Sequence, residues 1–107
     1  MFKLKDIKLN KGITLDKQGN ALTYKSGYQV SKCDLAIIPA YRLRKSQLLD
    51  MLNAIPVGSC LGVWIDSGKA YIDQSARISN KRLALKVGRQ LNQISVWDWK
   101  ASEAIAC

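Results

Sequence analysis

The chain contains no histidine among its 107 residues. Without an imidazole group it cannot form a Ser-His-Asp or Cys-His catalytic site, nor a metal centre with histidine ligands. General acid–base chemistry would depend on carboxylates, lysine, tyrosine or cysteine. The absence therefore favours a protein that is not an enzyme, and we expect neither a bound metal nor a cofactor.

Cysteine is also scarce and unsuitably spaced. The three cysteines, Cys33, Cys60 and Cys107, are an odd number and form no CxxC pair. Such spacing argues against a disulfide framework and against a structural zinc site. We expect Cys33 and Cys60 to pack as small apolar side chains in the core.

Long apolar runs are missing as well. No run approaches the roughly 20 residues that span a bilayer. The opening, MFKLKDIKLNKG, alternates apolar and charged residues and has no continuous apolar segment of the kind found in signal peptides. We therefore expect a cytoplasmic protein with no membrane partner.

Recognisable phosphate-binding and catalytic motifs are absent. The glycine-containing stretches GSCLG (58–62) and SGK (67–69) match neither a P-loop nor a dinucleotide fingerprint. Asp66 and Asp73, the best candidates for a carboxylate pair, would lie about 13 Å apart along a hairpin, which is too far for a shared metal. Nucleotide binding or sequestration is thus the last of the functions considered.

Positive charge is what the chain has in excess. The net charge is +9, and residues 1–45 hold ten Lys or Arg against three Asp. Such an excess favours an acidic protein surface, a nucleoprotein complex or nucleic acid as the partner.

Two groups of basic residues are candidates for that contact. The first group precedes the predicted helix at 46–55 and consists of Tyr41, Arg42, Arg44 and Lys45. The second lies along one side of the predicted helix at 81–92 and consists of Arg82, Lys86 and Arg89. Solvated surface is the commonest role of such residues and is the alternative interpretation of both groups. They predict a binding surface for a phosphate backbone only if they adjoin in space.

Periodicity predicts a single two-layer α+β domain over residues 1–107. Strands are expected at 2–9, 13–24 (a hairpin), 28–31, 34–40, 62–73 (a hairpin) and 94–99, with helices at 46–55 and 81–92. The sheet is expected to be mostly antiparallel, with six or seven strands and a right-handed parallel crossover before the last. Ser46 is the expected N-cap of the first helix, and Ser79 or Asn80 that of the second.

The second hairpin, GVWIDSGKAYID, is the clearest local prediction. Its turn is the dipeptide at 67–68, so Asp66 faces Lys69 and Trp64 faces Tyr71. The opposite side of the hairpin is then apolar and faces the core: Val63, Ile65, Ala70 and Ile72.

The aromatic set Trp64, Tyr71, Trp97 and Trp99 has three interpretations: a layer of core, the anchor of a protein interface, or a stacking surface for nucleic acid or nucleotides. For a domain this small, we favour core first and interface second. Trp97 and Trp99 share one strand face, while the helix at 81–92 is expected to cover Ile94 and Val96 on the other. The cover over the two indoles is left open between the N-terminal strands, a second copy of the chain and a partner.

One segment resembles known proteins. Residues 62–98, GVWIDSGKAYIDQSARISNKRLALKVGRQLNQISVWD, are similar to a hairpin–helix–strand unit of small accessory proteins of phages and mobile elements. The resemblance implies a phage or plasmid accessory protein that acts by binding inside a host cell, as inhibitors of host defence complexes such as CRISPR do. Direct binding of DNA or RNA is the alternative function.

Overall fold

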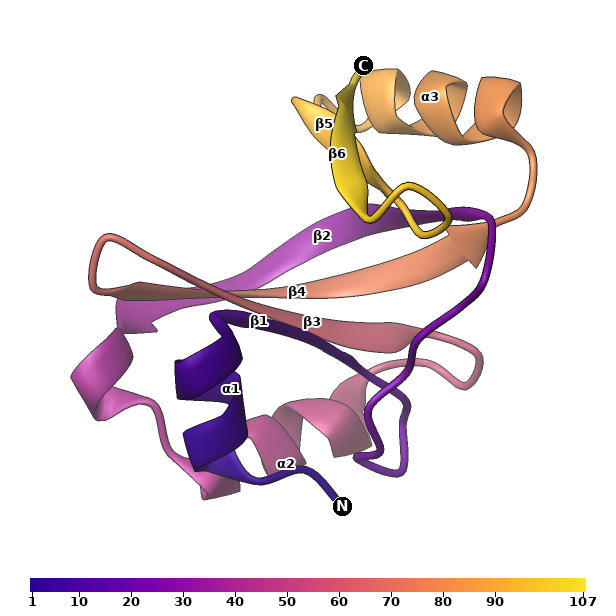
Figure 1. Ribbon diagram of the computed structural model, residues 1–107. Coiled ribbons are helices and arrows are strands. Elements are labelled where there is room, and N and C mark those ends of the chain that lie inside the picture. Colours follow the sequence, from indigo (N-terminus) through magenta and orange to yellow (C-terminus); the bar gives the residue numbers. More distant parts are fainter.

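A computed structural model describes residues 1–107 as one curled six-stranded sheet with three helices (Figure 1). The strands are β1 (Gly12–Leu15), β2 (Tyr28–Pro39), β3 (Cys60–Asp66), β4 (Lys69–Ile78), β5 (Ser95–Asp98) and β6 (Glu103–Ala106). The helices are α1 (Leu4–Asn10), α2 (Lys45–Ala54) and α3 (Lys81–Gln90), with a 3-10 turn, η1 (Ala40–Arg42), before α2. The α+β prediction is confirmed, with three helices in place of two.

Every neighbouring pair of strands is antiparallel, in the order β1-β3-β4-β2-β5-β6. The hairpin β3–β4 has the predicted register, with Asp66 opposite Lys69 and Trp64 opposite Tyr71. Its turn residues Ser67 and Gly68 both have positive φ, as a type I′ turn requires. None of the helices is long and apolar enough to cross a membrane.

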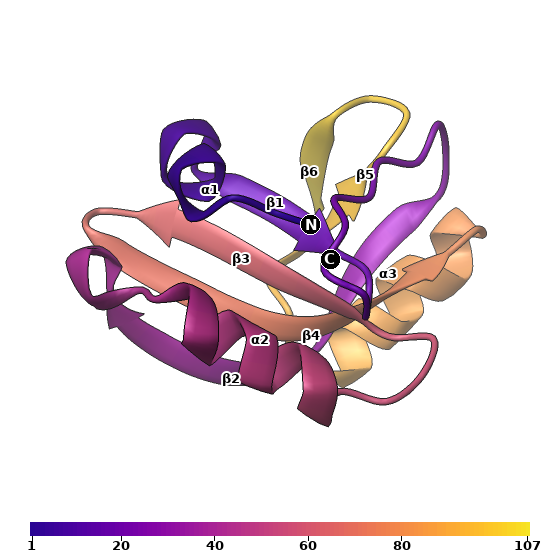
Figure 2. The same cartoon turned by 90° about the horizontal axis from the view of Figure 1, so that it is seen from below.

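The main core lies between the helices α1 and α2 and one face of β1, β3 and β4. Figure 2 shows α2 lying across that face of the sheet. Eleven buried side chains form this core: Phe2, Ile7, Leu15, Leu43, Leu48, Leu52, Ile55, Leu61, Val63, Ala70 and Ile72. The alternation of β3 and β4 therefore directs the predicted apolar side of the hairpin toward the helices.

A smaller core holds α3 against β2 and β5, at the far end of the curled sheet from α2 (Figure 1). Val30, Ala84 and Val96 are its buried members. Ala84 and Gly88 are the buried residues of α3, because their small side chains let the helix backbone approach the sheet closely. Helical spacing predicts an apolar stripe of Leu83, Val87 and Leu91 on this helix, but only Val87 packs against the core, and Leu83 and Leu91 are exposed.

The first expected strand is wrong: residues 4–10 form the helix α1. The apolar residues of this segment follow helical spacing, which buries Ile7 completely against the sheet. Lys11 then ends the helix in a left-handed conformation, donating its backbone N–H to the Ile7 carbonyl.

Three further strand predictions need correction. The hairpin expected at 13–24 has only its first strand, β1, and a single bridge from Leu15 to Ala21 stands in place of the second. The segments 28–31 and 34–40 form one strand, β2, whose pairing with β4 shifts between Ser31 and Cys33 and again between Asp34 and Ala36. The crossover through α3 joins β4 to β5, which run in the same direction, but the two do not pair. β2 lies between them and is antiparallel to both.

Several predicted positions are corrected by the packing. Cys33 is exposed, although Cys60 is buried as expected. Ile94 is 90% exposed, so α3 covers only Val96 on that side of β5. Arg44, and not Ser46, precedes α2 as its N-cap, while Asn80 caps α3 by accepting the Leu83 N–H.

Candidate functional site

A groove of about 800 Å³ lies on the face of the sheet that no helix covers. Strand alternation places its floor residues opposite those that pack against the helices, and the curl of the sheet makes this face concave. The lining residues come from β1 and β3 at one side, β4 and β2 in the middle, and β5 and β6 at the other, and they include Trp64, Trp97 and Trp99. All three tryptophans of the chain therefore meet in one groove.

A buried hydrogen-bond network fixes one wall of the groove. The Trp99 indole N–H donates to the side-chain oxygen of Gln29 at 3.1 Å, and the Gln29 amide donates to the Ser75 hydroxyl at 2.9 Å. Trp99 also makes edge-to-face contacts, with Trp97 at 6.4 Å and with Tyr24 at 5.6 Å between ring centroids. These contacts hold the Trp99 ring in one orientation.

Asp73 lies on the groove floor, between the tryptophans of β3 and β5. Its carboxylate occupies the space above Gly62 on β3, where a Cβ atom would overlap it. Burial raises the pKa of Asp73 from 3.8 to about 6, and the negative charge of Asp34 adds to the rise. The Ser31 hydroxyl and the Gly62 backbone oppose the rise, but neither supplies a positive charge.

Ser31 is a second unusual polar group of the floor. Its hydroxyl is close enough to Asp73 to lower the pKa of that carboxyl. Its oxygen is nevertheless buried without a hydrogen bond of full geometry. Buried polar atoms without a partner are rare in folded proteins, so Asp73 and Ser31 together leave hydrogen-bonding capacity unused at the groove floor.

Beside the groove, three large side chains lie in a row across the same sheet face. Ile37 on β2 pairs with Tyr71 on β4, and Tyr71 pairs with Trp64 on β3. Their exposed fractions are 59%, 37% and 56%, respectively. We call these three residues, of which Tyr71 and Trp64 are aromatic and Ile37 is aliphatic, the aromatic row. At its end the Trp64 ring lies over Gly12 of β1, where a Cβ would come within 2.9 Å of the indole.

The four predicted aromatic residues thus share one sheet face. Trp64 belongs to both the groove and the aromatic row, Trp97 and Trp99 line the groove, and Tyr71 lies in the row only. None of the four is among the buried residues of either core. The preference for core is therefore wrong for Trp64 and Tyr71, while Trp97 and Trp99 are half-buried and receive part of their cover from Tyr24.

The two basic groups do not adjoin. Tyr41, Arg42, Arg44 and Lys45 lie in η1 and at the start of α2, whereas Arg82, Lys86 and Arg89 are exposed on α3. In Figure 1 the sheet separates α2 from α3. Within the first group, Arg42 lies over the Tyr41 ring at 5.6 Å and Lys45 over the Phe2 ring at 5.5 Å. The condition for one continuous basic surface is not met.

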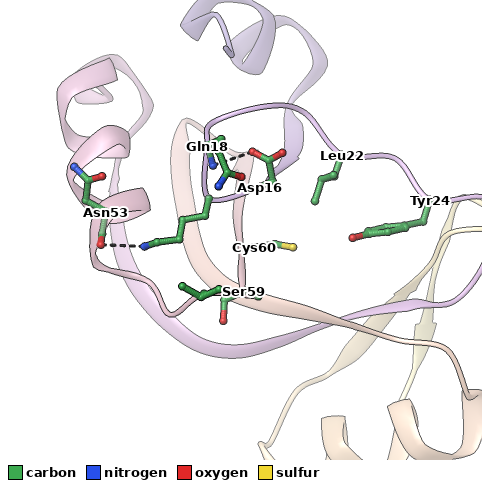
Figure 3. A pocket seen from close by; sticks show the side chains of 10 residues that line it. Asp16, Gln18, Leu22, Tyr24, Asn53, Ser59 and Cys60 are labelled. Carbon is green, nitrogen blue, oxygen red and sulfur yellow. Dashed lines mark hydrogen bonds between the residues drawn. The ribbon is translucent and has the colours of Figure 1, made fainter.

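A second, more polar hollow of about 580 Å³ lies between the β1–β2 loop and the end of α2. Figure 3 shows Asn53 at one end of it, Tyr24 at the other and Cys60 between them. Burial raises the pKa of the Cys60 thiol, so this cysteine remains protonated and is a poor nucleophile at neutral pH. Lys17 lies across the hollow toward α2, and its contacts identify a structural role.

Lys17 satisfies the carboxyl end of α2. Its ammonium group donates to the carbonyl oxygens of Leu52 at 2.9 Å, Asn53 at 3.1 Å and Ile55 at 2.6 Å. These carbonyls have no partner within the helix, and a cation is favourable at this end of the helix dipole.

Replacing Lys17 by methionine is expected to lower the free energy of unfolding by about 2 kcal/mol, because three carbonyls, two of them in partly buried bonds, lose their charged donor. Urea unfolding at neutral pH measures the change. Lys25→Met, at an exposed lysine of the same loop, is the matched control and is expected to have little effect. Equal effects of the two substitutions would contradict the capping role.

The groove floor is not evident from the sequence. Gln29 and Ser31 belong to a short predicted strand with no functional motif, and Asp73 is too far from Asp66 to form a carboxylate pair. Gln29 carried one usable signal, since a polar residue between Tyr28 and Val30 in a predicted central strand requires a buried partner. No group of three or more His, Cys, Asp or Glu side chains is placed to hold a metal ion.

Comparison of this chain with protein-family models, with curated proteins and with solved structures found no match.

Proposed function

We propose that this protein acts by binding another protein through the uncovered face of its sheet, without catalysing a reaction. The observation that carries the proposal is the aromatic row, three large side chains that stay exposed although they lie in the middle of a folded sheet. Tyrosine and tryptophan are the residues that most often contribute large binding energies at protein interfaces.

The position of the row supports an interface. Its strands β2, β4 and β3 are rigidly paired, so a partner would meet a preformed surface with little loss of conformational entropy. The helices α1 and α2 cover the other side of these strands. Contiguous exposed apolar side chains of this kind are uncommon on a protein that has no partner.

The partner that we propose is an acidic protein surface. The net charge of +9 attracts such a surface and speeds its association. The resemblance of residues 62–98 to phage and plasmid accessory proteins makes a host defence nucleoprotein complex the preferred example. Inhibition of that complex would then follow from occupying its surface.

The test is affinity capture from a host lysate with the tagged protein. We expect a specific partner to be retained by the native chain, and Trp64→Ala or Tyr71→Ala to weaken its binding about 30-fold, which corresponds to a hot-spot loss of about 2 kcal/mol. Ile94→Ala is the matched control, because Ile94 is more exposed than any residue of the row and lies away from it, just before β5. Melting temperatures of all variants verify that each is folded.

Direct nucleic-acid binding is the second candidate function, favoured by the three exposed cations of α3. It is tested in the same experiment by treating the lysate with nuclease. Capture that is lost on nuclease treatment and on charge reversal at Arg82, Lys86 and Arg89, but not in Tyr71→Ala, would replace the protein-binding proposal with this one. The protein-binding proposal would also be overturned if the native chain captured no partner, or if Trp64→Ala and Tyr71→Ala captured it as well as the native chain does.

A further inference from the structure

We propose that the groove beside the aromatic row is a binding site for a planar, amino-bearing heteroaromatic ring of the nucleobase or nucleoside class, without a phosphate. This site shares Trp64 with the proposed protein interface but does not rest on that interface. Its floor and far wall are formed by Gln29, Asp73, Trp97 and Trp99, while Ile37 and Tyr71 of the row lie outside the groove.

The walls are suited to a flat aromatic ligand. Trp64 lies on β3, Trp97 on β5 and Trp99 in the turn after β5, so indoles flank the groove on two sides. Three strand spacings separate β3 from β5, about 14 Å along the sheet, and the curl brings the two walls closer. Stacking on indole is a principal source of affinity for nucleobases.

The wall of the groove that Trp99 forms is preorganised in the free protein. Its indole N–H is already bonded to Gln29, and its ring is held between Trp97 and Tyr24. On the other wall, the absence of a side chain at Gly12 allows the Trp64 ring to lie close to the β1 backbone. Preorganised rings lose little entropy when a ligand stacks on them.

The floor calls for a ligand that donates hydrogen bonds. Asp73 is the only charged residue of the lining, and neither lysine nor arginine is present there to pair with it. The nearby Ser31 oxygen also lacks a partner. When the ring of a base stacks on an indole of the groove, its exocyclic amino group would donate to the Asp73 carboxylate, as amino groups of bases donate to acidic side chains elsewhere.

The same composition argues against a phosphate in the groove. A phosphate group would meet the negative charge of Asp73 and no compensating cation among the lining residues. The ligand class is therefore narrowed from the nucleotides considered in the sequence analysis to a base or nucleoside. The sugar of a nucleoside would extend toward the open side of the groove. A phosphorylated ligand is expected to bind more weakly.

Tryptophan fluorescence provides the test, because every tryptophan of the chain lines the groove. The probe is adenosine. Purine riboside, which lacks only the amino group, and adenosine 5′-monophosphate are the comparators. We expect saturable quenching by adenosine, with each comparator binding about tenfold more weakly, since a hydrogen bond to a charged acceptor is lost in one and repulsion is added in the other.

Asp73→Asn is the diagnostic variant. The variant keeps an acceptor oxygen but loses the charge, so it is expected to reduce the preference for adenosine over purine riboside. It is also expected to abolish the decrease in affinity that the native protein shows between pH 7 and pH 5, where Asp73 takes up a proton. Tyr71→Ala, which alters only the row, is expected to leave adenosine binding unchanged. The failure of one site is therefore distinguishable from the failure of the other.

Four results would overturn the assignment. They are no quenching by adenosine up to about 10 mM, a concentration that detects even very weak sites; equal affinity for adenosine and purine riboside; tighter binding of the monophosphate; and an unchanged preference in Asp73→Asn. Quenching by an oligosaccharide such as chitotriose, without quenching by adenosine, would instead assign the groove to a carbohydrate.

Discussion

Asp73→Asn is expected to stabilise the fold at pH 7, raising the free energy of unfolding by up to about 3 kcal/mol. The native carboxyl has a pKa of about 6, against 3.8 as its ordinary value, so the folded state holds its proton more tightly than the unfolded chain does. Above pH 6 folding must therefore bury an ionised carboxylate. Asparagine fills the same space above Gly62 without that charge.

The sign of the pH dependence follows from the same shift. Because the pKa of Asp73 is raised on folding, its contribution to stability is fully present below about pH 4 and is lost as the pH rises through about 6. Native protein is expected to gain stability as the pH falls through this window, whereas Asp73→Asn should lack this component. Urea unfolding between pH 4 and pH 8 measures both.

Asp66→Asn is the control for this prediction. Asp66 lies on the same hairpin, but its side chain is exposed at the turn. Its replacement removes the same charge from the surface and is expected to change stability by less than about 0.5 kcal/mol. If Asp73→Asn proves destabilising at pH 7 while Asp66→Asn is neutral, favourable bonds hold the carboxylate in place. The inference that Asp73 is buried with unused hydrogen-bonding capacity is then wrong.

A group that weakens the fold where it stands is typical of a functional site. Asp73 fits this description because burial, and not a partner, controls its pKa. A ligand that supplies a donor would remove the unfavourable burial and would add to the stability of the complex. The stability measurement and the adenosine titration therefore test two consequences of one feature.

The elements that local sequence specifies were predictable. The hairpin β3–β4 was predicted with its register, since the Ser67-Gly68 turn and the alternation on either side agree. The helices α2 and α3 follow from apolar spacing and, for α3, from the Asn80 cap. In each case neighbouring residues contain the whole signal.

Long-range pairing was not predictable to the same degree. The insertion of β2 between β4 and β5 depends on a twelve-residue strand that bends at two irregular positions, which the sequence displays as two short runs. The helix α1, of seven residues, has too few turns for helical spacing to be told from a strand with a bulge. Tertiary packing decides both cases.

The candidate site shows the same difference between local and long-range information. The tryptophans were recognisable one by one, because large aromatic residues in predicted strands attract attention. Their meeting in one groove required the positions of β3 and β5 on either side of β4 and β2. The importance of Gln29 and Ser31 arises only from what surrounds them, and no local pattern marks a polar residue as the support of a distant indole.

Gln29→Met is expected to lower the free energy of unfolding by about 2 to 3 kcal/mol, although it preserves volume and adds apolar surface. The cost arises because two partners lose their bonds together: the indole N–H of Trp99 and the hydroxyl of Ser75. Both lie beside a residue that is only 8% exposed, so water has little access to replace the bonds.

Gln93→Met is the matched control for this final prediction, because Gln93 also lines the groove but makes no side-chain hydrogen bond to Trp99 or Ser75. Urea unfolding of the pair isolates the contribution of the network, and tryptophan emission reports whether the Trp99 ring has moved. If Gln29→Met were as stable as its control and left the emission unchanged, the Trp99 wall would be held by aromatic packing alone. A destabilised Gln29→Met that also loses adenosine quenching would connect the buried network to the binding site, because the wall must be fixed for a ring to stack on it.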